Sequence, residues 1–308
     1  MNRKPQKIIL MRGGALGDFL LTLPALTALR RCYPGSHISV ITYSRAAFLA
    51  QSAGIINNVT SLDRAEFSLL FEKNVDASDF LRKYFRDCDL VINYLNDPLQ
   101  VSTANIRQFC SAEFIILEPF PKLMPAWQFF AKPLLNAGLI DKYTPARLNL
   151  PASIQIKGVK HLKDLPPGIK FAIHPGSGSK KKNWALSNYL ELAHILKGKG
   201  FSPFFITGEA DRDIFKNLMA IDHGYRLFNE LALEEISGIL MNSAHYIGND
   251  SGITHLAGVI GIPSIALFGP TDPSIWAPPG EHVKVVSTAD PESTYTRIIE
   301  QIDQAFSA

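Results

Sequence analysis

The sequence predicts an α/β protein built from two doubly wound domains, and three observations support this prediction. The chain has 308 residues, which is enough for two domains with separate cores. Short apolar runs alternate with amphipathic stretches along both halves, a pattern typical of parallel sheets covered by helices on both faces. A polar, proline-containing stretch at 145–168 interrupts the alternation and predicts a linker followed by a loop. We therefore expect a first domain at 1–150 and a second domain from residue 151 onward.

The first domain begins with a strand, a glycine turn and a helix. The apolar run at 7–11 ends just before Gly13 and Gly14. Leucines at positions 20, 23, 26 and 29 then follow the spacing of one helix face, which predicts a helix over 18–31. The same alternation predicts strands at 37–43, 90–95 and 113–117 and helices at 45–53 and 127–139.

The second domain repeats this alternation. Strands are expected at 171–174, 202–207, 245–248, 264–268 and 283–286, and helices at 186–197, 211–220, 233–242, 253–260 and about 295–306. In open α/β sheets, ligands bind outside the carboxyl ends of the strands. The loops that leave a strand are therefore the segments in which functional residues are expected.

The composition is that of a soluble globular protein. Hydrophobic residues make up 46% of the chain and charged residues 19%, which excludes disordered, collagen-like and coiled-coil proteins. The cysteines are Cys32, Cys88 and Cys110; they show no metal-ligand spacing, and their odd number argues against a disulfide framework. The first apolar run is too short for a signal peptide or a membrane span. We expect a soluble, cytoplasmic protein with reduced thiols.

The net charge of +3 is divided unevenly between the two halves. Residues 1–150 contain 17 Lys and Arg against 12 Asp and Glu, a charge of +5, whereas residues 151–308 contain 14 against 16, a charge of −2. This excess is too diffuse for a nucleic-acid groove. It favours an anionic substrate, or a membrane surface rich in anionic lipid, as the partner of the first half.

The first loop with functional potential follows the first strand. Gly13, Gly14 and Gly17 allow a tight turn and a close approach to a ligand, and Asp18 falls in the first turn of the next helix. Asp18 is either a capping residue of that helix or a carboxylate that faces a ligand. The spacing differs from the G-x-G-x-x-G dinucleotide fingerprint, which argues against a dehydrogenase.

The second loop, at 174–184, combines small residues with three consecutive lysines. Backbone N–H groups, the Ser177 hydroxyl and a lysine suit a phosphate oxyanion, although the order differs from that of a P-loop. The alternative is a solvated basic loop. His174, at the end of the strand, is predicted to be a hydrogen-bonded structural histidine.

The third loop, at 248–255, leaves a strand and starts a helix. The N–H groups of Ser251, Gly252 and Ile253 have no partner within that helix and, with the helix dipole, form an anion site. His255 lies one turn further along and is within reach of a bound phosphate. The alternative is a capped helix with a buried histidine.

Two further loops give weaker signals, and several common motifs are missing. Glu209 and Asp211 follow another strand and are candidates for ribose contacts, or are simply acids at a helix N-terminus. The turn at 268–273 indicates only a chain reversal. The sequence has no H-E-x-x-H, C-x-x-C or G-x-S-x-G motif, so it implies neither a bound zinc nor a serine hydrolase.

Three groups of residues, in order along the chain, resemble the motifs of a known protein family. They are Leu16-Gly17-Asp18 leading into Thr22-Leu23-Pro24-Ala25-Leu26; His174-Pro175-Gly176-Ser177 with Lys182 and Trp184; and the run G-N-D-S-G-I-T-H-L-A from Gly248 to Ala257, followed by Phe268-Gly269-Pro270-Thr271-Asp272-Pro273. With these motifs, which span both halves from residue 7 to about 275, the chain resembles glycosyltransferase family 9. The members of that family are the heptosyltransferases of bacterial lipopolysaccharide core assembly.

The resemblance implies a GT-B fold, in which two Rossmann-like domains face each other across a cleft that holds the active site. It implies that domain 1–150 binds the acceptor, that domain 151–292 binds the nucleotide sugar, and that the C-terminal helix at about 293–308 packs back on the first domain. It also implies sugar transfer with inversion and without a metal or other cofactor. The expected donor is ADP-heptose, and the expected acceptor is a lipopolysaccharide core or a related glycan.

The resemblance also implies roles for individual residues. Asp18 is the expected general base, and Gly13, Gly14 and Gly17 form the loop beside the sugar. The residues expected to hold the donor diphosphate are Ser177, Lys182, Asp250, Ser251, Gly252 and His255. Lys180 and Lys181 leave the identity of the phosphate lysine open, and Ala185 stands where family members commonly have proline.

The expected partners are a nucleotide-sugar donor, a lipid-linked glycan acceptor and the anionic inner face of the cytoplasmic membrane, but not nucleic acid. Two alternatives remain open. One is a nucleotide-sugar epimerase of the same fold, which would convert the donor without any acceptor. The other is a catalytically silent nucleotide-sugar-binding protein or assembly factor, which would bind the donor and transfer nothing.

Overall fold

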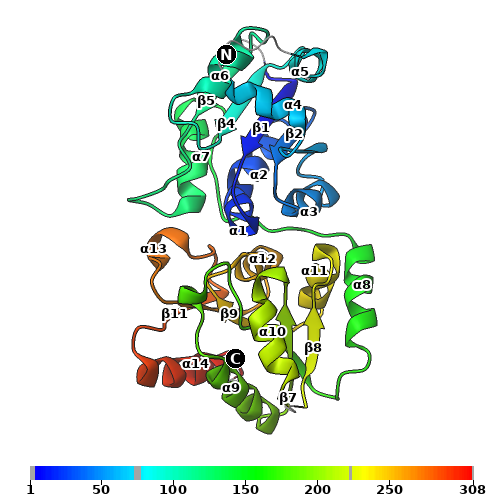
Figure 1. Cartoon of the computed structure of the whole chain (residues 1–308), viewed down its shortest axis with the longest axis vertical. Coiled ribbons are helices and arrows are strands. Elements are labelled where there is room, and N and C mark those ends of the chain that lie inside the picture. Colours follow the sequence, from blue (N-terminus) through cyan, green and yellow to red (C-terminus); the bar gives the residue numbers. More distant parts are fainter. Residues whose placement is uncertain (1–3, 73–77, 222–223, 307–308) are drawn as a thin grey trace. The chain divides into compact units, whose positions relative to one another are not determined.

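The computed structural model describes residues 4–72, 78–221 and 224–306. The chain divides into two compact units, Met1–Ala146 and Arg147–Ala308, hereafter unit 1 and unit 2 (Figure 1). This division lies close to the boundary expected at residue 150. Within the described residues, no helix combines the length and the apolar character needed to cross a membrane.

Unit 1 contains a five-stranded sheet in the order β3-β2-β1-β4-β5, and all of its neighbouring strands are parallel. Its strands are β1 (Lys7–Arg12), β2 (His37–Thr42), β3 (Asn58–Ser61), β4 (Leu90–Tyr94) and β5 (Glu113–Ile116). Its helices are α1 (Leu16–Leu20), α2 (Leu23–Cys32), α3 (Ala46–Ser52), α4 (Ala65–Ser68), η1 (Leu69–Phe71), α5 (Asp79–Phe85), α6 (Val101–Arg107) and α7 (Ala126–Asn136). The central strands β1 and β4 are almost entirely buried, as the apolar runs predict.

Unit 2 contains a six-stranded parallel sheet in the order β11-β10-β9-β6-β7-β8. Its strands are β6 (Ile169–His174), β7 (Phe201–Thr207), β8 (Arg226–Asn229), β9 (His245–Asn249), β10 (Ser264–Phe268) and β11 (Val283–Ser287). Its helices are α8 (Ala152–Leu162), η2 (Lys180–Lys182), α9 (Leu186–Gly198), η3 (Glu209–Asp211), α10 (Arg212–Met219), α11 (Leu233–Met241), α12 (Gly252–Ile260), α13 (Pro273–Trp276) and α14 (Pro291–Phe306).

The C-terminal helix α14 belongs to the core of unit 2. Ile298 and Ile302, one helical turn apart, are 0% and 2% exposed and join a cluster of side chains from the sheet and from α9. Tyr295 packs its ring against Trp184 at a centroid distance of 6.0 Å. The apolar face of α14 therefore covers its own sheet, which differs from the expectation that this helix packs on the first domain.

Helix α8 lies in the stretch that was predicted to be linker and loop. It packs along α11, as Figure 1 shows for the two adjacent helices. Gly158 and Gly238 form the crossing point, because a Cβ added to Gly158 would lie 1.9 Å from the Gly238 carbonyl carbon. Two glycines allow the backbones to approach this closely, and the small residue that permits the contact also weakens the helical pattern in the sequence.

Two other differences from the predicted elements have local causes. The single helix expected over 18–31 is divided into α1 and α2, and Pro24 lies in the first turn of α2, where its missing N–H costs nothing. Strands β3 and β8 were not predicted. Each has only four residues and lies at an edge of its sheet, where a sustained apolar run is not required.

Each sheet has one point at which the strand order reverses. In unit 1 the chain builds outward from β1 to β3 and then resumes at β4 on the other side of β1. In unit 2 it builds from β6 to β8 and resumes at β9 on the other side of β6. Loops that leave two such neighbouring strands diverge to opposite faces and create a crevice between them. The candidate site residues lie at these two reversal points.

Candidate functional site

The loop after β1 closes around the side chain of Asp18. Gly14 has a φ of +88°, and a Cβ at this position would lie 2.7 Å from Oδ2 of Asp18. Only glycine accommodates both this backbone conformation and the carboxylate beside it. Asp18 Oδ2 accepts a hydrogen bond from the Ala15 N–H at 2.8 Å, so Asp18 caps the start of α1 from inside its first turn.

The second oxygen of Asp18 faces Arg12. The Arg12 guanidinium lies 3.3 Å from Asp18 Oδ1, and the two side chains are 3% and 33% exposed respectively. The carboxylate is thus held by the Ala15 N–H on one oxygen and by a buried cation on the other, while a third of its side chain remains open to solvent. Both alternatives for Asp18, a helix cap and a carboxylate that faces a ligand, are compatible with this geometry.

Arg12 is a site residue that the sequence prediction did not include. Its guanidinium carbon lies 4.5 Å from the centre of the Phe130 ring, and Arg12 pairs in register with Tyr94 on β4. Burial lowers the pKa of Arg12, and the charge of Asp18 opposes that shift. Arginine remains protonated in such surroundings. The signal in the sequence was a charged residue directly after the apolar run at 8–11.

The other two glycines of this loop are less constrained than Gly14. A Cβ on Gly13 would meet Leu95 at 3.8 Å, an ordinary contact distance. Gly17 lies inside α1. Of the three glycines predicted to lie near the sugar, Gly14 is therefore the one whose conformation positions Asp18.

In unit 2, Asn249 connects the two loops at the reversal point. His174 on β6 pairs in register with Gly248 on β9, so both loops start from the same edge of the sheet. Asn249 Oδ1 accepts hydrogen bonds from the Trp184 N–H and from the Tyr189 hydroxyl, each at 2.9 Å. Its Nδ2 donates to the Pro175 carbonyl at 2.8 Å. One buried amide thus holds the lysine-containing loop against the end of β9.

Lys182 is the lysine that reaches the start of α12. Its Nζ lies 2.7 Å from Asp250 Oδ2, and the two side chains are 30% and 7% exposed. The Thr271 hydroxyl donates to the same carboxylate oxygen at 2.7 Å. Lys180 pairs instead with Asp213 on the surface, and Lys181 is exposed. The geometry therefore favours Lys182 over Lys181 as the phosphate lysine.

The N-terminus of α12 lies immediately beside this pair. Ser251 is the N-cap, and its hydroxyl oxygen accepts from the Thr254 N–H. The amides of Gly252 and Ile253 are in the first turn, where no preceding helical carbonyl is available to them. His255 is 5% exposed, and its Nε2 lies 4.0 Å from Asp250 Oδ1. The predicted residues Lys182, Asp250, Ser251, Gly252 and His255 are thus brought together.

The hydroxyl of Ser177, which was predicted to hold the donor diphosphate, contacts groups of its own loop. Its hydroxyl lies 2.7 Å from the Ser179 carbonyl and 2.6 Å from Asn183 Oδ1, and it accepts from the Ser179 N–H at 3.2 Å. These contacts are all within the loop itself. The Ser177 side chain shapes the segment that presents Lys182.

Asp211, a candidate for a ribose contact, supports the backbone of two neighbouring loops. It is 4% exposed, and a Cβ on Gly176 would lie 1.8 Å from its Oδ1. Its Oδ2 accepts from the Gly208 N–H at 2.9 Å, so the acid stabilises the start of η3 beneath the Gly176 loop. Glu209 is exposed and remains a candidate for a ribose contact. His174 is confirmed as a hydrogen-bonded histidine, since its Nδ1 lies 2.9 Å from the Ile206 carbonyl.

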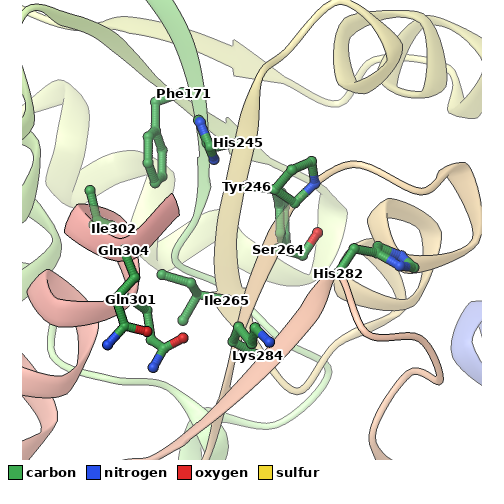
Figure 2. Close-up of a pocket in the computed structure, with 11 residues that line it drawn as sticks. Phe171, His245, Tyr246, Ser264, Ile265, His282, Lys284, Gln301, Ile302 and Gln304 are labelled. Carbon is green, nitrogen blue, oxygen red and sulfur yellow. The ribbon is translucent and has the colours of Figure 1, made fainter. Parts of the chain in front are cut away.

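A cavity of about 320 Å³ lies at the opposite edge of the unit 2 sheet, where β9, β10 and β11 begin. Figure 2 shows Phe171 and His245 side by side on one wall, with ring centroids 5.6 Å apart, and Gln301 and Gln304 of α14 on another. The candidate ligand residues lie at the carboxyl ends of the strands. This cavity is therefore separate from the candidate site.

The residues described by the structure include no cluster of three or more His, Cys, Asp or Glu side chains that could hold a metal ion. The chemical groups gathered at the two reversal points are a carboxylate held by a buried arginine in unit 1, and an ammonium with a helix N-terminus in unit 2. The first can accept a proton, and the second can bind an oxyanion.

Comparison with known proteins finds similar sequences. Residues 153–303 match the model of glycosyltransferase family 9 (heptosyltransferase). The chain is 25% identical to lipopolysaccharide heptosyltransferase 1 of Pseudomonas aeruginosa, over 87% of this chain and 79% of that protein. It is 21% identical to lipopolysaccharide heptosyltransferase 3 of Escherichia coli, over 85% and 83%.

A solved structure shows the fold. The ADP-heptose lipopolysaccharide heptosyltransferase II of Escherichia coli matches with a TM-score of 0.78 at 16% identity, over 97% of this chain and 98% of that chain. The expected GT-B fold is thereby confirmed. The family model covers most of unit 2, and the sequence alignments extend the similarity through unit 1. The chain is therefore similar to the heptosyltransferases of glycosyltransferase family 9, and these relatives support a glycosyltransferase.

Proposed function

We propose that this glycosyltransferase moves heptose from ADP-heptose to a lipopolysaccharide-core acceptor, with inversion and without a bound metal. Asp18 is the general base, and the start of α12 with Lys182 holds the donor diphosphate. The names of the relatives support the class of donor and acceptor. The observation that carries the assignment of residues is that each unit holds one partly exposed charge against a buried partner at its reversal point.

The donor site follows from charge and geometry in unit 2. An ammonium has three N–H donors, and the bond of Lys182 to Asp250 uses one of them. The exposed part of Lys182 and the first-turn amides of α12 are then available to phosphate oxygens. When the diphosphate departs, its negative charge is stabilised by these groups, whose positions are already fixed by Asp250 and by the Ser251 cap.

The base follows from the geometry of unit 1. In an inverting step, the acceptor hydroxyl oxygen forms a bond to the anomeric carbon, and the bond from that carbon to the diphosphate oxygen breaks. The hydroxyl proton passes to the Asp18 carboxylate, and ADP leaves with the electron pair of the broken bond. Arg12 and the Ala15 N–H hold the carboxylate in one orientation, which is what efficient proton transfer requires.

The charge distribution supports the placement of the acceptor in unit 1. Residues 1–150 carry the +5 excess, which would attract the phosphates of a lipopolysaccharide core and of anionic lipid. We therefore place the enzyme at the inner face of the cytoplasmic membrane, as a peripheral protein. Sedimentation with vesicles of anionic lipid should decrease as salt is raised, whereas vesicles of neutral lipid should bind little at any salt concentration.

The decisive experiment uses the full chain with ADP-heptose and a truncated core acceptor, and it follows both ADP release and the mass of the acceptor. We expect ADP and glycosylated acceptor in equal amounts, undiminished by a chelator of divalent metals, with an anomeric configuration opposite to that of the donor by NMR. Asp18→Asn serves as the inactive control. Donor binding without transfer to any core acceptor would instead support a silent binding protein, and retention of configuration would exclude Asp18 as the base of a single displacement.

A further inference from the structure

Two thiols lie together at the edge of unit 1 that is opposite Asp18. Cys88 is in the turn between α5 and β4, and Cys110 follows α6. They are 7% and 8% exposed and belong to the apolar cluster beneath the sheet. Neither forms a disulfide in this structure. The sugar-transfer mechanism uses neither residue, so any role of these thiols is independent of it.

The backbone brings the two residues to the same carbonyl group. The Cys88 N–H donates to the Phe85 oxygen at 3.2 Å, and the Cys110 thiol reaches the same oxygen at 3.6 Å. The Cys88 sulfur lies 3.3 Å from the Leu90 carbonyl oxygen. Both residues are therefore held beside the Phe85 carbonyl group.

The thiols also line one cavity. Its volume is about 440 Å³, and its polar lining consists of Arg82, Arg86, Asp87 and Ser111. The Lys7 ammonium is anchored beside it, donating to the Tyr84 and Arg86 carbonyls at 2.7 Å each. Three cations against one carboxylate thus surround the pair, and the cavity reaches residues that are themselves packed in the core.

The two thiols have different acidities. A hydrogen bond between the two thiols lowers the pKa of Cys110 to about 6, with the charge of Lys7 contributing. The same hydrogen bond, with burial, raises the pKa of Cys88. Cys110 is therefore the more acidic thiol of the two. This asymmetry is what distinguishes an attacking cysteine from a resolving one.

We propose that Cys110 and Cys88 are a peroxide-reactive dithiol that closes to an intramolecular disulfide. The Cys110 thiolate attacks one peroxide oxygen, and the O–O bond breaks to give a sulfenic acid and, with a proton from solvent, water. The Cys88 sulfur then attacks the sulfenic sulfur, the S–O bond breaks, and the released hydroxide takes the Cys88 proton to form a second water. The two thiols are oxidised by two electrons, and one peroxide is reduced to two waters.

The first test counts thiols in the full chain after treatment with hydrogen peroxide. We expect two of the three thiols to be lost. Mass spectrometry without reductant should find the peptides of Cys88 and Cys110 joined, with the mass lowered by two hydrogen atoms, and dithiothreitol should reverse the change. Cys32→Ser is the matched control and should form the same link. Oxidation of Cys32 before the pair, or a link between two chains, would overturn the proposal.

Single variants separate the two roles. In Cys88→Ser, peroxide should leave Cys110 as a sulfenic acid that dimedone traps, with no disulfide. In Cys110→Ser, Cys88 should stay reduced under the same treatment. Failure of dimedone to label Cys110 in the first variant, or equal oxidation of Cys88 in the second, would overturn the assignment.

A pH profile gives a readout that packing alone would not change. In the Cys32→Ser background, the rate of alkylation of Cys110 by iodoacetamide should rise with a midpoint near pH 6. Adding Cys88→Ser should move this midpoint toward about 8.5, the value of an ordinary thiol, because the hydrogen bond from Cys88 is lost. An unchanged midpoint would show that Cys88 does not activate Cys110, which would overturn the proposed pair.

Discussion

Each sheet has an ion pair at its reversal point, and the two pairs bury charges of opposite sign. In unit 1 the exposed member is the carboxylate of Asp18 and the buried member is Arg12, at 33% and 3% exposure. In unit 2 the exposed member is the ammonium of Lys182 and the buried member is Asp250, at 30% and 7%. The same arrangement therefore leaves a carboxylate partly exposed in one unit and an ammonium partly exposed in the other, according to which sign is buried.

The helices at the two points also differ, and this difference explains why only one of them suits a phosphate. α1 has five residues and its first-turn N–H groups are partly used by Asp18, whereas α12 has nine residues and a serine cap. A negative side chain already occupies the anion position of α1. The start of α12 is beside Asp250 but retains amides for an incoming ligand.

The largest effect is expected from neutralising the exposed carboxylate. Asp18→Asn retains an oxygen that can accept from the Ala15 N–H, so the loop should persist, but the amide cannot take up a proton from the acceptor. We expect kcat to fall by about 10²- to 10⁴-fold, the range typical of general bases. ADP affinity measured by calorimetry should be unchanged, because unit 2 is untouched. A loss of affinity in place of turnover would assign Asp18 to binding.

The corresponding change in unit 2 should act on binding. Lys182→Ala removes the ammonium, and ADP affinity should fall roughly 10- to 100-fold, as expected for a hydrogen bond to a charged group. The effect should shrink at high salt less than that of a fully exposed charge, since the Lys182 side chain is only 30% exposed. Lys181→Ala is the matched control one residue away and should bind ADP like the unaltered protein. Equal losses in both variants would reduce the assignment to general basic charge.

A smaller effect, on stability, should distinguish the glycines of the two loops. Gly14→Ala combines a positive φ with a Cβ 2.7 Å from Asp18 and should cost about 1–3 kcal/mol in the free energy of unfolding. Gly176→Ala has an ordinary φ but places its Cβ 1.8 Å from Asp211, and should destabilise through that clash alone. Gly13→Ala, whose nearest neighbour is at 3.8 Å, is the control.

Urea unfolding measures all three variants, and turnover separates them further. Gly14→Ala should lower kcat as well, because it displaces Asp18, whereas Gly13→Ala should leave both stability and kcat nearly unchanged. If Gly13→Ala proved as damaging as Gly14→Ala, then the loop as a whole, and not the Gly14 conformation, would be what positions the base.

How far the sequence predicts the site depends on whether a feature is local. The turn glycines, Asp18 in the first turn of a helix, and the serine cap of α12 are local, and their neighbours along the chain predict them. The pairing of Lys182 with Asp250 joins residues 68 positions apart, and only the fold shows it. The same holds for the position of Asp211 beneath Gly176 and for the burial of Arg12, which no periodicity can indicate.

The elements of the fold, like the site residues, could be predicted where the signal is local in the sequence. Nine strands were predicted because buried parallel strands are nearly continuous apolar runs, and each corresponds to an observed strand to within two residues at either end. Helix α8 was missed because its Gly158 is needed for a contact with Gly238, far along the chain, and a glycine lowers local helical propensity. The packing of α14 was misjudged because an amphipathic helix indicates that it has a buried face, but not which sheet buries that face.

The smallest effect is expected from removing the hydrogen bond that the Thr271 hydroxyl donates to Asp250. Thr271→Val removes the hydroxyl that donates to Asp250 Oδ2 at 2.7 Å but keeps the shape of the side chain, and should cost about 0.5–1.5 kcal/mol in stability. Thr271→Ser keeps the donor and should cost less. Since Lys182 still neutralises the carboxylate, ADP affinity should change little.

The double variant shows whether the two donors share one task. With Lys182→Ala already present, Thr271 still donates to Asp250 Oδ2, so adding Thr271→Val leaves a buried carboxylate oxygen without either of these partners. The combined loss of stability should therefore exceed the sum of the single losses by about 0.5 kcal/mol or more. Strictly additive losses would mean that Asp250 is held independently of Lys182. In that case the two units would be alike only in having one exposed and one buried charge at the reversal point. The buried Asp250 would not depend on Lys182 for its stability.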